Sequence, residues 1–374
     1  MKLRILIFVT RMNVGGVTSL ILEQISKSSN PDLEYFLVYG STESNEIEDS
    51  RLRELPCKIL RLNYLQRSIN PIKDLLAFIE FIRILRIIKP QIIHSHMFKA
   101  GLVSRVANLI MLNKKMTIHT YHGELTEGYF GGIKVFLYLL IEKILSNFTT
   151  TFIAVSKDTK NSLIDKGIGN TKKWIVINPG VDFKKAGSDS RNKNSTPTVI
   201  WVGRFERVKD PILAIQTFHE LKMLSSHSYN VLMIGNGSLW KKASQLNFEN
   251  KLNIKLTGWL NSIEKHFKSA HILFMTSVNE GFGLVALEAA KYSIPTISTD
   301  CGGIRDFIVD GKNGILTSRE PKEIASKLDK LIRNSSEVRR LGNNAYKLAY
   351  KKFSISDYIR KNEKLYFRIY VSKK

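Results

Sequence analysis

The chain has 374 residues, enough for two domains, and 43% of them are hydrophobic. This ordinary composition argues against a disordered, collagen-like or disulfide-dense protein, and the only two cysteines, Cys57 and Cys301, form no metal-binding spacing. Lys and Arg number 57 against 33 Asp and Glu, so the net charge of +24 favours partners such as nucleic acid, anionic lipid or phosphorylated substrates.

Neither a membrane-spanning segment nor a secretory signal is recognisable. The chain has no uninterrupted run of about 18 apolar residues, the length that a transmembrane helix needs. The apolar run near the start is short and ends at Arg11, unlike a secretory signal. We therefore expect a cytoplasmic protein.

In the first half of the chain, short β-branched runs alternate with longer helical patterns. Strands are expected at 5–9, 35–39, 92–94, 117–121 and 151–155, and helices at 17–26, 71–89, 100–112 and 132–146. This alternation is typical of a mostly parallel sheet with helices on both faces.

The stretch 184–197 has no aromatic or large aliphatic residue and is the best linker in the chain. The alternation then restarts, with strands expected at 199–202, 231–234, 254–257, 272–275 and 296–298, helices at 210–223, 284–291 and 321–333, and a helical tail at 337–370. The sequence therefore predicts two doubly wound α/β domains, 1–185 and 186–354. We expect a C-terminal helix, 355–374, to pack back on the first domain.

Two short motifs follow predicted strands, where ligands of such sheets bind. Gly15 and Gly16 lie between a strand and a helix and could let the backbone approach an anion, although a plain tight turn explains them equally well. Arg204 and Lys209 follow the strand 199–202 and could clamp a diphosphate, or could simply be solvated. A complete GxGxxG is absent, which counts against a dinucleotide oxidoreductase.

The segment EGFGLVALE, from Glu280 to Glu288, is the strongest motif. Its two glycines would let the backbone approach a substrate, and a helix would begin at Leu284 with its free N–H groups facing a phosphate. Glu280 and Glu288 could both accept hydrogen bonds from sugar hydroxyls. The simpler alternative is a helix N-terminus with one favourable acidic residue and one surface Glu.

In combination, these motifs resemble the retaining glycosyltransferases of family GT4, of the bacterial envelope and capsular polysaccharide type. The resemblance covers nearly the whole chain and rests on the order of several segments: the GG loop, INPGVD at 177–182, WVGRFERVKDP at 201–211, MIGNG at 233–237, the E-x7-E pair and DGKNG at 310–314. One departure is Asn178-Pro-Gly where the family more often has Pro-Asn-Gly. The resemblance implies the GT-B fold, with two Rossmann-like domains facing a central cleft.

The resemblance also implies a role for each matching residue. Glu280 would contact hydroxyls of the donor sugar, and Glu288 would contact the ribose. Arg204 and Lys209 would bind the diphosphate, which Gly16 would approach from the first domain. Backbone N–H groups for the sugar and phosphate would come from Gly283, Leu284 and Val285. His122 matches the family's histidine in the cleft, so the catalytic set is His122, Glu280, Arg204 and Lys209.

Four histidines, His94, His96, His119 and His122, lie near predicted strand ends. No carboxylate or cysteine cluster accompanies them, and the Asp-x-Asp signature of metal-dependent glycosyltransferases is absent. We therefore expect no metal and no cofactor. We favour a sugar contact for His122 over a buried structural role, and for His96 the two interpretations balance.

The acceptor is expected on the first domain. Residues 58–116 contain 11 Lys or Arg and 2 acidic residues, and the helix 71–89 is apolar on most faces. This pattern suits an anionic membrane surface, although a core helix with one solvated face explains it equally well. Tyr129 and Phe130 are candidate acceptor contacts. We expect a lipid-linked, polyprenyl-linked or envelope glycan as the acceptor. The expected donor is a nucleotide-sugar, with a UDP-sugar favoured. We expect the protein on the inner face of the plasma membrane.

Three other interpretations remain at this point. A sugar-nucleotide epimerase could share the fold, and a degenerate non-catalytic partner is disfavoured by the intact E-x7-E. The net charge also allows a non-enzymatic nucleic-acid-binding protein, but no recognised RRM, KH or zinc-finger motif accompanies it. We therefore expect no nucleic-acid partner.

Overall fold

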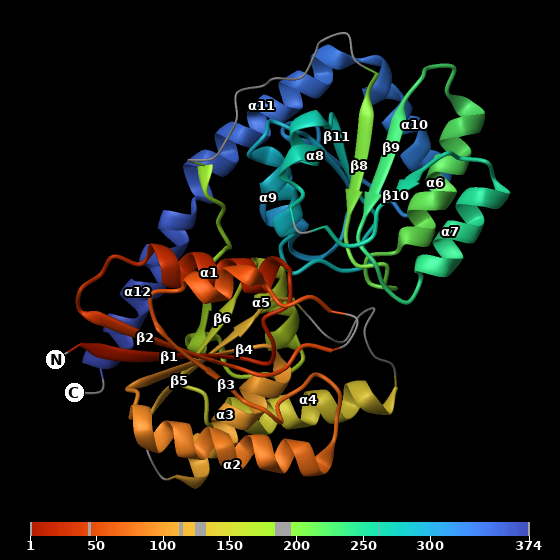
Figure 1. Ribbon diagram of the computed structural model, residues 1–374. Helices are drawn as coiled ribbons and strands as arrows, with labels where there is room; N and C mark the ends of the chain where they lie inside the picture. Colours follow the sequence, from red (N-terminus) through yellow and green to blue (C-terminus); the bar gives the residue numbers. More distant parts are fainter. Residues whose placement is uncertain are drawn as a thin grey trace. The chain divides into compact units, whose positions relative to one another are not determined.

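Figure 1 shows the computed structural model, which describes residues 2–43, 46–111, 115–123, 132–183, 196–260 and 262–372. The chain forms two compact units. Among the described residues, the first unit contains those up to residue 123, Gly132–Pro179 and those from Ile355 onward. The second unit contains Gly180–Ser354.

The first unit is built on a seven-stranded parallel sheet. Its strands are β1 (Leu3–Val9), β2 (Leu33–Tyr39), β3 (Lys58–Arg61), β4 (Ile92–His96), β5 (Met116–Tyr121), β6 (Thr151–Ala154) and β7 (Trp174–Val176). They lie in the order β3-β2-β1-β4-β5-β6-β7 and every neighbouring pair is parallel. The carboxyl ends of the strands therefore meet at one edge, where ligands of such sheets bind.

Helices cover both faces of this sheet. They are α1 (Gly16–Lys27), α2 (Pro71–Ile88), α3 (Phe98–Ile110), α4 (Ile133–Ser146), α5 (Lys157–Asp165) and α12 (Ile355–Val371), with 3₁₀ turns at Ser50–Glu54 and Thr171–Lys173. Helices α2 and α3 pack on the face that carries Phe8, whose ring stacks on that of Phe81 with centroids 4.2 Å apart. Helices α1 and α12 pack against each other on the opposite face (Figure 1).

Helix α2 has the boundaries that its sequence predicts. The Asn70 side chain accepts a hydrogen bond from the backbone N–H of Lys73 at 3.0 Å, and Pro71 occupies the first turn. At the other end, Lys89 adopts a left-handed conformation with φ of 50°, directly before Pro90. These local signals define the helix before any tertiary packing is considered.

The second unit contains a six-stranded parallel sheet. The strands are β8 (Thr198–Val202), β9 (Asn230–Ile234), β10 (Lys255–Leu256), β11 (Ile272–Met275), β12 (Thr296–Thr299) and β13 (Gly314–Thr317), in the order β10-β9-β8-β11-β12-β13. The helices are α6 (Pro211–Leu224), α7 (Trp240–Glu249), α8 (Glu264–Ser269), α9 (Leu284–Ala290), α10 (Pro321–Arg333) and α11 (Ser335–Lys352), with a 3₁₀ turn at Gly302–Asp306. Trp201, Phe218 and Phe274 lie at the centre of its main core.

The helical tail predicted at 337–370 consists of two helices. The chain forms α11 and α12, which are separated at Phe353 and Ser354. The ring of Phe353 packs against those of Phe282 and Phe307, with centroids 5.3 and 5.7 Å away, and its carbonyl accepts a hydrogen bond from Val181. These contacts hold Phe353 in the second unit, and α11 ends directly before it.

Helix α12 is held on the first unit by polar contacts with α1 and by an aromatic contact with the sheet. Gln24 donates a hydrogen bond to the Tyr366 hydroxyl at 2.8 Å, and Ser28 donates one to Glu363 at 2.6 Å. The rings of Tyr366 and His94 also pack in a T-shaped arrangement, with centroids 5.7 Å apart. The last helix of the chain therefore contributes to the core of the first unit.

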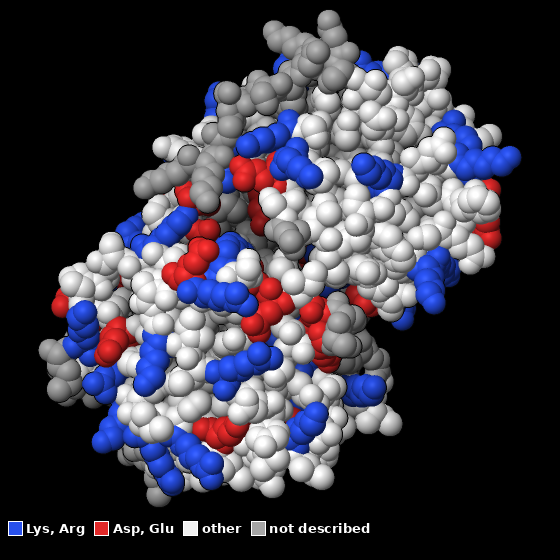
Figure 2. All heavy atoms as spheres, in the orientation of Figure 1, with Lys and Arg blue, Asp and Glu red and all other residues white. Residues whose placement is uncertain are grey.

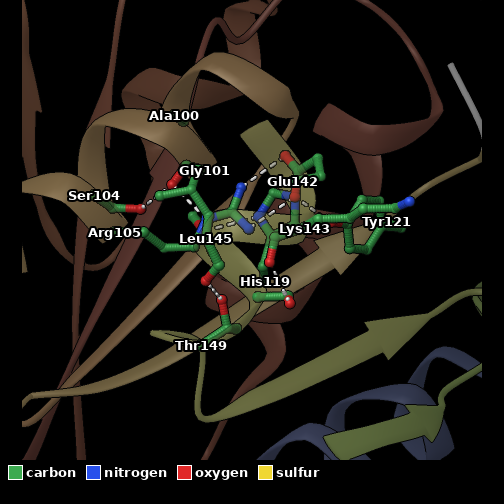
Figure 3. A network of polar contacts seen from close by, with 12 residues as sticks. Ala100, Gly101, Ser104, Arg105, His119, Tyr121, Glu142, Lys143, Leu145 and Thr149 are labelled. Atoms are coloured by element: carbon green, nitrogen blue, oxygen red, sulfur yellow. Dashed lines mark hydrogen bonds and ion pairs between the residues drawn. The ribbon is translucent and has the colours of Figure 1, made fainter. Parts of the chain in front are cut away.

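A fully buried ion pair joins α3 to α4 (Figure 3). Both side chains of Arg105 and Glu142 are 0% exposed, and two guanidinium nitrogens of Arg105 each donate to a carboxylate oxygen of Glu142 at 2.8 Å. The hydroxyl of Tyr121 on β5 also donates to this carboxylate, and the Nε of Arg105 donates to the carbonyl of Gly101 at 2.8 Å. The charges of the pair are therefore compensated without solvent.

We predict that Glu142→Gln destabilises the protein by about 3 kcal/mol or more, because the buried Arg105 guanidinium loses its counter-charge. The matched control is Glu264→Gln, which breaks the exposed pair of Glu264 with Lys268 and is expected to cost less than about 0.5 kcal/mol. Urea unfolding followed by circular dichroism measures both. Equal losses in the two variants would show that burial adds nothing to the importance of the Arg105–Glu142 pair.

Candidate active site

Two loops at the carboxyl edge of the second sheet are fastened together. One follows β8 and the other follows the adjacent strand β11. The backbone N–H of Val278 donates to the carbonyl of Val208 at 2.8 Å, and the Thr276 hydroxyl donates to the carbonyl of Lys209 at 2.9 Å. The indole N–H of Trp201 donates in turn to Thr276 at 3.0 Å. Groups on the two loops are thereby held in a fixed relation.

Lys209 and Glu280, which the sequence analysis selected from these two loops, form an ion pair. The Lys209 ammonium contacts the Glu280 carboxylate, and the Ser277 hydroxyl donates to the same carboxylate at 2.6 Å. Glu280 is only 7% exposed, whereas the Lys209 side chain is 23% exposed. The site therefore combines a sheltered carboxylate with a more accessible cation, which suits a ligand that carries both hydroxyls and negative charge.

The conformation of Glu280 depends on a glycine pair that follows β12. The Gly303 N–H donates to the Glu280 carbonyl at 2.7 Å. Gly302 has a φ of +51°, and a Cβ built on it would lie 2.3 Å from that carbonyl oxygen and 2.7 Å from the side chain of Asn279. Only a residue without a side chain fits this position. Gly302 was not predicted as a site residue, and its only signal in the sequence is the GG doublet after a strand.

At the start of α9, the backbone also packs closely against a neighbouring segment. Gly283 has a φ of +81°, and a Cβ there would lie 2.4 Å from Ile304. Leu284 and Val285 form the first turn of α9, and no side chain caps the N–H groups at that end. Glu288 is half-buried on the second turn of the same helix. Polar backbone and a carboxylate thus lie on the element that directly follows the Glu280 loop.

Two arginines complete the polar environment of these loops. Arg204 is half-buried in the loop after β8, as its position in the sequence predicts. Arg319, which the sequence did not predict, donates to the carbonyls of Thr276 at 3.2 Å and Ser277 at 3.1 Å and pairs with Asp210. Arg319 thereby ties the segment after β13 to both loops. No motif around residue 319 could have indicated this contact, because it depends on three separate strands.

In the first unit, the structure brings His96 and His122 together. Nδ1 of His96 lies 2.9 Å from Nε2 of His122, and the two rings are stacked with centroids 5.1 Å apart. The ring centroids of His94 and His96 lie 4.3 Å apart. The two ring nitrogens of His94 are hydrogen-bonded to the hydroxyls of Tyr366 and Thr120, both at 2.7 Å. These histidines form a line from the core of the unit to the end of β5.

Burial keeps these imidazoles neutral. It lowers the pKa of His94 to about 3 and that of His122 to about 4, and it holds the pKa of His96 well below its usual value. Gln24 donates to the Tyr366 hydroxyl, so that hydroxyl donates its own proton to Nδ1 of His94, and His94 then donates from Nε2 to Thr120. Near neutral pH, His122 therefore offers a hydrogen bond rather than a positive charge.

The tautomer of His96 follows from its other ring nitrogen. Nε2 of His96 is buried without a hydrogen-bond partner among the described residues. A buried N–H without a partner is costlier than an unpaired acceptor, so we assign the proton to Nδ1, from which His96 donates to His122. His122 then carries its own proton on Nδ1.

Other candidates have a less defined place. Gly16 is exposed at the first residue of α1, where no side chain caps the helix. Tyr129 and Phe130 lie outside the described residues. Among the described residues, no group of three or more His, Cys, Asp or Glu side chains is arranged to hold a metal ion.

Comparisons with known proteins agree on one class of enzyme. Residues 14–185 match the family model for Glycosyltransferase Family 4, and residues 182–348 match that for Glycosyl transferases group 1. The capsular polysaccharide biosynthesis glycosyltransferase CapM of Staphylococcus aureus is 27% identical over 325 residues, which cover 82% of this chain and 84% of that protein.

Two further proteins are similar over most of their length. The UDP-Gal:alpha-D-GlcNAc-diphosphoundecaprenol alpha-1,3-galactosyltransferase of Escherichia coli is 25% identical over 326 residues, covering 82% of this chain and 83% of that protein. The crystal structure of Anabaena HepE in complex with UDP and glucose has a TM-score of 0.80 at 16% identity, covering 97% of this chain and 99% of that one. This last likeness concerns the fold alone.

We predict that Gly302→Ala lowers the catalytic rate about tenfold or more, because the new methyl group would displace the Glu280 backbone. The control is Gly311→Ala. Gly311 also has a positive φ, of 67°, but a Cβ there meets nothing within 4 Å. Both variants therefore carry similar backbone strain, and only one crowds Glu280. Steady-state rates and melting temperatures distinguish them, and equal rate losses would refute this role of Gly302.

Proposed function

This chain belongs to the glycosyltransferases of the GT4 type with the GT-B fold, and we propose that it is a retaining enzyme that uses a UDP-sugar. The sugar is a hexose or N-acetylhexosamine, and the acceptor is a lipid-linked or cell-envelope glycan. Support comes from the relatives, since one is named for capsular polysaccharide biosynthesis and another for galactose transfer to a diphosphoundecaprenol-linked sugar.

The observation that carries the proposal is the Lys209–Glu280 ion pair at the ends of β8 and β11. In the proposed donor site, Lys209 and Arg204 bind the diphosphate, Glu280 binds hydroxyls of the transferred sugar, and Glu288 binds the ribose. The N–H groups of Gly283, Leu284 and Val285 face the sugar and phosphate. A diphosphate that enters this site would take over the Lys209 ammonium, and Glu280 would then be available to the sugar.

The proposed chemistry is stabilisation of the leaving group. The nucleoside diphosphate departs with growing negative charge, and fixed cations aimed at that charge lower the barrier. In the proposed front-face reaction, the departing phosphate accepts the proton of the acceptor hydroxyl, which attacks the same side of the anomeric carbon. Glu280 then binds and orients the sugar and does not become a covalent nucleophile.

The first unit is the proposed acceptor side. His122 is the best supported contact there, because its neutral imidazole is held by His96 and offers a proton from Nδ1 to a sugar oxygen. Peripheral association with an anionic membrane on the cytoplasmic side belongs to the same proposal. The excess of Lys and Arg over residues 58–116 supports it, and Figure 2 shows basic side chains distributed over the surface.

Three substitutions test the donor assignment. Lys209→Ala should lower kcat about 100-fold or more, because Lys209 faces charge that develops during departure of the leaving group. Glu288→Gln should mainly raise the donor KM, because the ribose does not change during the reaction. Glu280→Gln should lower kcat, because the ring of the bound sugar distorts as its bond breaks.

The control for these variants is Glu249→Gln on α7, an exposed glutamate that bonds only to Gln245 among the described contacts, and its kinetics should match the parent. The measurement is steady-state transfer from a UDP-sugar to a lipid-linked acceptor, with the anomeric configuration of the product determined by NMR. Inversion of that configuration would contradict the retaining mechanism. Unchanged kinetics in Glu288→Gln, together with only a raised KM in Lys209→Ala, would contradict the donor assignment.

A further inference from the structure

Helix α4 presents a continuous apolar surface to solvent. We call this surface the α4 stripe. It consists of Ile133, Phe136, Leu137, Leu140 and Ile144 on the helix, and Phe148 just beyond its end. Each of these residues is between 44% and 79% exposed. Their spacing of three or four positions places them along one side of the helix, over a length of about 22 Å.

The opposite side of α4 is firmly anchored, so the stripe cannot turn inward. Tyr138, Glu142 and Leu145 are buried, and Glu142 is held by the pair with Arg105. The helix therefore uses a different side to build the core of its unit. Single exposed apolar residues are normal on a protein surface, but a contiguous group of this size marks an interaction site.

The charges around the stripe favour an anionic partner. Lys134 and Lys143 are exposed on α4, and its one acidic residue, Glu142, is buried and paired. At the C-terminal end of the helix, the Lys173 ammonium donates to the carbonyls of Ser146 at 2.9 Å and Asn147 at 3.3 Å. A second copy of this chain would bring the same lysines against each other, so self-association through the stripe is disfavoured.

The dimensions of α4 favour a helix that lies on a bilayer. Its 14 residues span about 21 Å, less than the ~30 Å thickness of a bilayer's hydrocarbon core. In the described parts of the chain, no helix has both the length and the apolar character needed to cross a membrane. Exposed apolar residues also occur on α2, at Ile72, Leu75 and Ile79. Helix α3 contacts both α2 and α4, on the same side of the sheet (Figure 1).

We propose that α4 inserts its apolar stripe into the interface of an anionic membrane, parallel to the bilayer plane. The inference deepens the proposed membrane association, which rested on the basic charge of residues 58–116 and on the apolar helix 71–89. It assigns an apolar contact to an element outside that region. Insertion of large apolar side chains makes binding persist when salt screens the lysines. A purely electrostatic contact would be lost under those conditions.

The test is co-sedimentation with phosphatidylcholine vesicles, with and without phosphatidylglycerol, at low and high salt and without any sugar substrate. The intact protein should bind the anionic vesicles and keep part of this binding at high salt. The double variant Phe136→Ser/Leu140→Ser should lose about tenfold or more in partitioning, with an unchanged melting temperature. Phe248→Ser on α7 removes a phenylalanine that is 85% exposed but lies outside the α4 stripe, on the other unit, and this variant should bind like the parent.

The possible outcomes separate this inference from the wider proposal. Parent-like binding by the double variant would overturn the role of α4 and leave the basic surface as the membrane contact. Binding that disappears entirely at high salt would also overturn insertion. A dimer of the parent that the double variant abolishes, without vesicle binding by either protein, would assign the stripe to a second copy. None of these results bears on donor transfer, which is measured separately.

Discussion

The candidate donor site depends on the contact between one ammonium group and one sheltered carboxylate. Glu280 is almost completely removed from solvent, and a carboxylate in that position needs a counter-charge. Lys209 supplies it from the loop of the neighbouring strand. Thr276 also joins the two loops, and Gly302 packs closely against the Glu280 backbone. Parallel pairing of β8 and β11 makes the contact available in the first place.

The same contact gives the proposed reaction its order of events. While no donor is bound, the two charges neutralise each other. In the proposed site, the diphosphate of a nucleotide-sugar would compete with Glu280 for Lys209. Its arrival would free hydrogen-bonding capacity on Glu280 next to the incoming sugar. Binding of the nucleotide portion and orientation of the sugar would thus be linked through one side chain. Arg204, on the same loop as Lys209, would add a second cation for the diphosphate.

Much of this arrangement could be predicted from the sequence. The motifs around Arg204, Lys209, Glu280 and Glu288 led to a GT4-type enzyme with the GT-B fold, and the family and structural comparisons confirm that class and fold. Such motifs are readable because each one directly follows a strand. The roles of the individual residues are still predictions.

Contacts between distant segments could not be predicted in this way. Arg319 reaches Thr276 and Asp210 through folding alone, and the break at Phe353 depends on aromatic partners from elsewhere in the chain. The exposed stripe of α4 was also hidden, because the pattern at 132–146 is apolar nearly all round. The buried pair of Arg105 and Glu142, together with buried Tyr138 and Leu145, shows which side of α4 faces the core.

The central claim is that the Lys209 ammonium pairs with Glu280 in the free enzyme and with the diphosphate when the donor binds. Calorimetric titration of UDP into Lys209→Ala, Glu280→Gln and the double variant tests it most directly. If Lys209 is the proposed diphosphate ligand, its removal weakens UDP binding strongly. Glu280→Gln leaves UDP binding intact or slightly tighter, because a competing negative charge is gone, and the double variant resembles Lys209→Ala. Loss of UDP binding in Glu280→Gln together with unchanged binding in Lys209→Ala would contradict the account.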